Sequence, residues 1–183
     1  MIKEIYPILD PPERLTNLGP VKKWTAKIAQ ENYDWVMSVR SARIDNLLKY
    51  FGLDFPVEGQ EYKFLIQLGD LVAAELCSEP NFRHFEGKIE LTAPGLSMAY
   101  DLALLIGDLL IRASGGIARW ILFRDEPRSM EFNLPALMGR RKDWEHGIIS
   151  VCLMHARAVA TERQTSDIWA RAYSNWFSLL MDD

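Results

Sequence analysis

The sequence predicts a mainly helical α+β fold, with five to six helices and one small antiparallel β-hairpin or sheet. Apolar residues recur at helical spacing through most of the 183 residues. One segment, residues 117–123, is instead dense in β-branched and aromatic side chains, which favour strands. Because the chain contains no low-complexity tract, residues 1–183 are expected to form a single globular domain, with residues 1–19 as an extended N-terminal segment.

The beginning of the chain is predicted to change from extended to helical near Pro20. Pro7, Pro11 and Pro12 are incompatible with a regular helix before that point. Residues 21–51 then have helical apolar spacing, ended by Gly52 in the position of a C-terminal cap. The pattern allows either one bent helix or two.

The next two predicted helices carry nearly the same phrase, Leu68-Gly69-Asp70-Leu71-Val72 and Ile106-Gly107-Asp108-Leu109-Leu110. A glycine inside a helix costs roughly 1 kcal/mol relative to alanine. Its occurrence twice in the same setting suggests that the two helices cross closely at Gly69 and Gly107. In that arrangement Asp70 and Asp108 could approach each other.

Short strands are predicted between and after these helices. Residues 88–92 alternate polar and apolar side chains and follow a predicted loop at 78–87. Residues 117–123 and 130–134 are predicted to pair as a hairpin around a turn at 125–128. Its unpaired edges would be available to a partner strand or to a second copy in a homodimer.

Two amphipathic helices are predicted to end the chain, with Ser166 as the N-cap of the last one. Cys77 and Cys152 lie in apolar helical stretches, which favours two buried thiols in a reducing compartment. The start of the chain has no signal-peptide pattern. Residues 95–113 are apolar but contain Asp101 and Asp108, so a buried helix is favoured over a membrane span. We therefore expect a soluble cytoplasmic protein.

Charge is unevenly distributed along the chain, whose formal net charge is −4. The overall acidity disfavours general nucleic-acid binding. Residues 112–142 reverse the sign, with seven basic side chains against three acidic ones. The densest basic cluster follows Gly139, and the partner-binding candidates are Arg128, Arg140, Arg141 and Lys142.

Asp70, Asp101 and Asp108 are the residues with the most chemical potential. Close carboxylates on neighbouring helices can hold a metal ion or share a proton. The chain lacks the Glu-x-x-His pair by which di-iron bundles are recognised. The competing interpretation is that these acids face solvent or pair locally with Arg112.

Other catalytic patterns are missing from the sequence. His84, His146 and His155 do not form a His-Glu-x-x-His motif, and no Cys-x-x-Cys pair occurs. Gly115-Gly116 follows a predicted helix, whereas a phosphate loop precedes one. We therefore assign no catalytic residue and no cofactor from the sequence.

One arrangement is similar to a known group. The Ile106–Leu110 phrase, Gly115-Gly116, a strand with Trp120, and Asn133-Leu134-Pro135 with Gly139 occur in that order. This order resembles a loose group of bacterial proteins that includes immunity proteins of contact-dependent or polymorphic toxin systems. The resemblance covers about residues 98–140, and it implies a protein partner rather than catalysis.

The sequence thus favours a non-catalytic bacterial protein-binding protein, an immunity-type inhibitor of a toxin. Two alternatives stay open. The first is a helical metal-binding protein or hydrolase that uses Asp70, Asp101 and Asp108. The second is a secretion chaperone, which would also be small, acidic and cytoplasmic.

Overall fold

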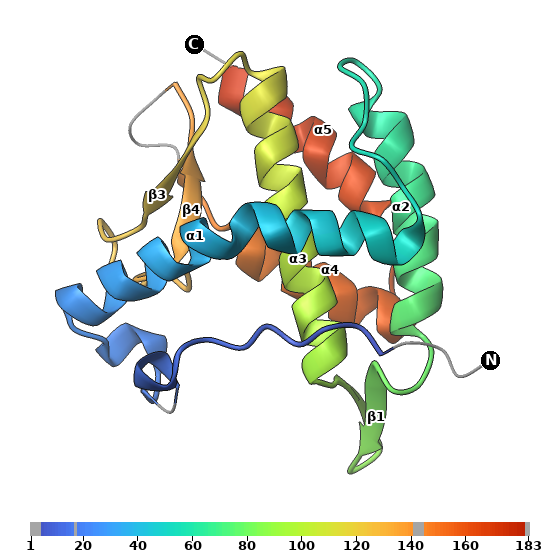
Figure 1. Cartoon of the computed structure of the whole chain (residues 1–183), viewed down its shortest axis with the longest axis horizontal. Coiled ribbons are helices and arrows are strands. Elements are labelled where there is room, and N and C mark those ends of the chain that lie inside the picture. The colour runs from blue at the N-terminus through green and yellow to red at the C-terminus, as the bar shows by residue number, and fades with distance from the viewer. Residues whose placement is uncertain (1–4, 17, 141–144, 182–183) are drawn as a thin grey trace.

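The computed structural model describes residues 5–16, 18–140 and 145–181, and it has the predicted mainly helical α+β architecture. Its centre is one helix, α3, and each of the other four helices contacts it (Figure 1). The helices are α1 (Ala26–Phe51), α2 (Glu61–Leu76), α3 (Ala93–Ala113), α4 (Ile148–Ala160) and α5 (Ile168–Met181). Helix α1 crosses α3 on one side, and the N-terminal segment runs beside α1 across the lower half of α3 (Figure 1).

Helix α3 is central because it is apolar around most of its circumference. An 18-residue window within this helix has a mean hydropathy of 1.4, so length and composition alone would allow the helix to cross a membrane. However, 78% of that window is buried inside the protein, as in the core helix of a soluble fold. The prediction of a buried helix is confirmed, although the acids inside it do not lower the hydropathy as far as expected.

Helix α1 is one continuous helix, which decides between the two alternatives left by the sequence. The side chain of Thr25 caps its first turn by accepting from the amide of Ile28. Gly52 ends it in the left-handed conformation, at φ 64°, as predicted. Pro20 instead precedes a short 3-10 turn, Val21–Lys23.

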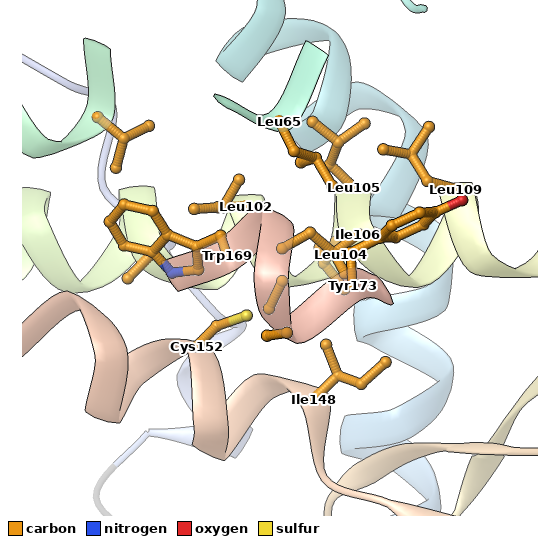
Figure 2. Packing of buried hydrophobic residues seen from close by; sticks show 14 of the residues in the cluster. Leu65, Leu102, Leu104, Leu105, Ile106, Leu109, Ile148, Cys152, Trp169 and Tyr173 are labelled. Atoms are coloured by element: carbon orange, nitrogen blue, oxygen red, sulfur yellow. The ribbon is translucent and has the colours of Figure 1, made fainter. Parts of the chain in front are cut away.

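The core is built where α3, α4, α5 and α2 meet. Figure 2 shows leucines of α3 packed between Leu65 of α2, Cys152 of α4, and Trp169 and Tyr173 of α5. Trp169 is among the largest fully buried side chains. The amphipathic stripe of the last helix is therefore its core-facing side, as its sequence pattern predicts. Burial of this apolar area is the main stabilising term of the fold.

The strands form two small antiparallel sheets rather than one. Strand β1 (Phe82–Phe85) pairs with β2 (Lys88–Leu91), and β3 (Arg119–Leu122) pairs with β4 (Pro135–Met138), to which β5 (Glu145–His146) adds. The predicted strand at 88–92 is confirmed, but its partner β1 lies in the segment expected to be a loop. The strand that returns to β3 is Pro135–Met138, so the prediction of residues 130–134 is wrong.

Two smaller predictions are also corrected. Cys152 is buried as expected, whereas Cys77 is exposed at the C-terminal end of α2, and both are free thiols. Helix α5 begins at Ile168, two residues after Ser166. The hydroxyl of Ser166 donates to Asp70 of α2 instead of capping α5.

Candidate functional site

Within the described part of the chain, Asp101 of α3 is the most deeply buried acid, and it is fully inaccessible to solvent. Arg43 of α1 donates from Nε to its Oδ1 at 2.9 Å, and Arg43 Nη2 lies 2.6 Å from its Oδ2. The hydroxyl of Tyr6 donates to the same Oδ2. Burial raises the pKa of Asp101 to about 6, although the bonds from Arg43 and Tyr6 act in the opposite direction. Both oxygens of the carboxylate are thus bound by Arg43 and Tyr6.

Arg43 also holds the N-terminal segment onto the helices. Its Nη2 donates to the carbonyl of Pro7 at 2.9 Å, and its Nη1 donates to the carbonyl of Ile8 at 3.3 Å. The amide of Leu9 donates to Ser97 Oγ at 2.8 Å. The cluster of Tyr6, Arg43 and Asp101 therefore fastens residues 6–9 across α1 and α3.

Asp108 lies seven residues further along α3 and serves a different contact. Trp120 of β3 donates from Nε1 to its Oδ1 at 3.0 Å, and Arg40 Nε lies 3.2 Å from its Oδ2. Burial raises its pKa, and the bond from Trp120 and the charge of Arg40 oppose that shift. This aspartate joins β3 and α1 to the central helix.

Gly69 and Gly107, which precede Asp70 and Asp108, do not meet each other, so the predicted crossing of the two helices at these glycines is wrong. A Cβ on Gly69 would lie 2.4 Å from the backbone oxygen of Ser166, and a Cβ on Gly107 would lie 2.1 Å from Cζ2 of Trp120. Asp70 accepts from Ser166, and Asp108 accepts from Trp120. In both cases the glycine admits a residue of another element and the next aspartate hydrogen-bonds that same residue.

The three candidate metal ligands therefore each bind different partners. Asp70 is bound to Ser166, Asp101 to Arg43 and Tyr6, and Asp108 to Trp120 and Arg40. Among residues 5–16, 18–140 and 145–181, no three His, Cys, Asp or Glu side chains are placed to share a metal ion. The predicted pairing with Arg112 is also wrong, because that guanidinium binds Glu61 at 2.7 Å.

Glu75 of α2, which the sequence places five residues after Asp70, is also buried. It accepts from the hydroxyl of Tyr50 at 2.9 Å and from Nδ2 of Asn81 at 3.0 Å. Beside it lies a hollow of about 580 Å³, also lined by Lys49 and Pro7. The bond from Asn81 ties the loop after α2 to that helix, which gives Glu75 a structural role.

Basic side chains from two distant parts of the chain gather near the connection between β3 and β4. Asn133 is buried in this connection and adopts a positive φ of 69°. Its backbone amide donates to the carbonyl of Phe123 at 2.8 Å, and its Nδ2 donates to the carbonyl of Val21 at 3.0 Å. As a result Lys22 lies beside this connection, and its Nζ donates to the carbonyl of Arg128 at 2.9 Å.

Apolar groups accompany these cations. Arg124 lies 5.8 Å from the centre of the Phe132 ring, in cation–π geometry. Met130 is one of the most exposed large apolar side chains, at 60%. Three acids belong to the same segment, of which Glu126 caps the amide of Arg128. We refer to Lys22, Arg124, Arg128 and Met130 as the basic surface.

The predicted partner-binding residues are only partly placed. Arg128 is exposed and belongs to the basic surface, and Arg140 is exposed just after β4. Arg141 and Lys142 lie outside the described residues. Sequence reasoning missed Lys22, because no sequence pattern connects positions 106 residues apart.

The outer edge of β3 is partly occupied. The hydroxyl of Tyr33, in α1, donates to the carbonyl of Trp120 at 3.0 Å. A strand partner could not use that carbonyl without displacing Tyr33. Side chains around the β3–β4 connection are therefore better placed for a partner than the backbone of β3.

Comparison with known proteins adds no relative from which a function could be transferred. No family model, no curated protein and no solved structure matches this chain. The candidate site must therefore be judged on its own geometry and charge.

Proposed function

We propose that this chain is a non-catalytic protein-binding protein and that the basic surface receives an acidic partner. The observation that carries the proposal is the bridge from Asn133 to Val21, beside which Lys22 reaches Arg128. Arginine and methionine are enriched in protein interfaces, and an exposed Met130 among cations fits that composition. Charge complementarity of this kind raises association rates and selects partners.

The use made of the buried acids supports a binding role over a catalytic one. Asp101, Asp108 and Glu75 each fasten one element of the fold to another. Their hydrogen-bonding capacity is directed at protein groups, whereas a catalytic carboxylate needs to reach a substrate. This arrangement favours the protein-binding proposal over the hydrolase alternative.

We further propose that the partner is a toxin and that the chain neutralises it in the cytoplasm, as an immunity protein does. The support is the resemblance across residues 98–140. Its motif includes Asn133, the residue that connects the two basic segments. An immunity protein needs a specific, fast-binding surface and no chemistry of its own.

Capture and kinetics with matched charge reversals test the binding proposal. The tagged chain is used to capture proteins from a lysate of the source organism, and the captured protein is purified. We expect R124E/R128E to lower its association rate by about tenfold or more at low salt. K63E reverses an exposed charge on α2 and should have no effect. Equal association rates for both variants would contradict the role of the basic surface.

The toxin proposal has a separate test. The captured partner is expressed in a host cell with and without this chain, and growth is measured. Growth inhibition that the wild-type chain relieves and R124E/R128E does not would support neutralisation. A partner that does not inhibit growth would contradict the immunity role and leave the protein-binding proposal standing.

A further inference from the structure

A groove lies between the β1–β2 hairpin and the C-terminal end of α4. It has a volume of about 530 Å³, within the range of small-molecule sites. Its lining consists of Gly87, Lys88, Ile89, Met154, Arg157, Ala158, Thr161 and Arg163. None of these residues belongs to the basic surface, so this groove is a second and separate feature of the molecule.

Three cations line this groove, and no acid is among its lining residues. Lys88, Arg157 and Arg163 are exposed, and none of their side chains has an ion pair or hydrogen bond within the described part of the chain. Other arginines close to acids in this fold are paired, as Arg83 is with Glu90 and Arg171 with Asp167. The groove therefore offers several guanidinium and ammonium donors to one ligand.

The end of α4 would ordinarily repel an anion, because its last carbonyls carry partial negative charge. Here those carbonyls already accept hydrogen bonds. The amide and hydroxyl of Thr161 both donate to the carbonyl of Arg157, and the amide of Arg163 donates to the carbonyl of Ala158. The arginine side chains are thus not needed to cap the helix.

The other lining residues are apolar. Met154 is 47% exposed, and Ile89 and Ala158 are partly buried beside it. An apolar surface next to unpaired cations matches a molecule with an anionic group and an apolar body. A phosphate monoester has this chemistry, since its charge and oxygens suit arginine donors.

We propose that this groove binds a small soluble phosphate monoester, with the phosphate on Lys88, Arg157 and Arg163 and the apolar part on Ile89 and Met154. The site is independent of the proposed partner-binding role. Phosphate recognition here uses side chains alone, so neutralising the arginines should remove it without unfolding the chain.

The test is an NMR titration of the whole chain with phenyl phosphate. We expect saturable shifts at residues 87–89 and 157–163, with affinity at least about tenfold weaker in R157Q/R163Q. R83Q, which neutralises a hairpin arginine outside the groove, should bind as the wild type does. Inorganic phosphate should bind more weakly than phenyl phosphate because it lacks the apolar part.

Several results would overturn the proposal. These are no saturable binding, shifts confined to other residues, equal affinity in R157Q/R163Q, or equal affinity for inorganic phosphate and phenyl phosphate. Cosedimentation with phosphatidic acid vesicles distinguishes the soluble ester from a lipid headgroup. Vesicle binding that R157Q/R163Q abolishes, in a chain that does not bind phenyl phosphate, would show that the ligand is a membrane phosphate.

Discussion

The indole ring of Trp120 lies directly against the backbone of α3 at Gly107. A Cβ added to Gly107 would fall 2.1 Å from Cζ2 of that ring, closer than real atoms approach. The same indole donates from Nε1 to Asp108, the next residue of the helix. The helix therefore accepts the ring at one residue and orients it at the following one, which fixes β3 on the core.

We predict that G107A destabilises the protein in the wild-type background and stabilises it when Trp120 is truncated. In the wild type, the new methyl group must displace the ring, which should lower the free energy of unfolding by about 1–3 kcal/mol. In a W120A background the clash is gone, and alanine's helix propensity should add up to about 1 kcal/mol. Urea unfolding of the four proteins measures both effects. A loss of the same size in both backgrounds would contradict the steric explanation.

At Gly69 no such rescue is expected. The nearest atom to an added Cβ is the backbone oxygen of Ser166, at 2.4 Å, so relief requires movement of the chain before α5. We predict that G69A lowers the free energy of unfolding by about 2–3 kcal/mol, and that S166A does not restore it. S166A alone removes the exposed bond to Asp70 and should cost less than about 1 kcal/mol. Restoration of stability in G69A/S166A would show that the side chain, not the backbone, is the obstacle.

These two glycines show what the sequence could and could not predict. An unfavourable residue inside a helix signals a close approach, and that part of the prediction is confirmed. The identity of the approaching element depends on the tertiary arrangement, which the local pattern does not contain. Gly69 and Gly107 therefore meet a loop backbone and an indole rather than each other.

For the strands and the basic surface, too, the local pattern predicts some features, and tertiary contacts determine the others. Helices with an apolar stripe were predicted well, because their spacing reflects which side is buried. Strand β1 is mostly exposed and so has no alternation to detect. Asn133, in a left-handed conformation, delays the return strand until Pro135. Lys22 reaches the basic surface only through contacts made across the fold.

The buried cluster of Asp101, Arg43 and Tyr6 leads to a third prediction. D101N leaves the guanidinium of Arg43 buried without a charged partner, and we expect a loss of about 3–5 kcal/mol in the free energy of unfolding. The triple variant Y6F/R43M/D101L removes the three polar side chains of the cluster together and should be more stable than D101N. Chemical denaturation compares the two. A triple variant less stable than D101N would mean that the ion pair contributes net stability.

D101N should also loosen the N-terminal segment. Asp101 binds Arg43, which in turn binds the carbonyls of Pro7 and Ile8, and the amide of Leu9 follows in the chain. We therefore expect hydrogen exchange at the Leu9 amide to accelerate in D101N under conditions where the core remains protected. The control is D108N, which weakens the separate contact with Arg40. Equal acceleration in both variants would indicate general destabilisation.

His155, half-buried on α4, gives a prediction about pH. Burial lowers its pKa from the ordinary 6.5, and the nearby positive charge of Arg171 lowers it further. The unfolded chain therefore takes up this proton more readily than the folded protein does. The stability that depends on neutral His155 is present above pH 6.5 and is lost as the pH falls below that value.

Because H155Q cannot take up the proton, its free energy of unfolding should fall less than that of the wild type between pH 7 and pH 5, roughly the range in which histidine titrates. Urea unfolding at several pH values measures this difference, and H84Q, at an exposed histidine of β1, is the matched control. Parallel pH profiles for wild type and H155Q would show that His155 is as easily protonated in the folded protein as in the unfolded chain.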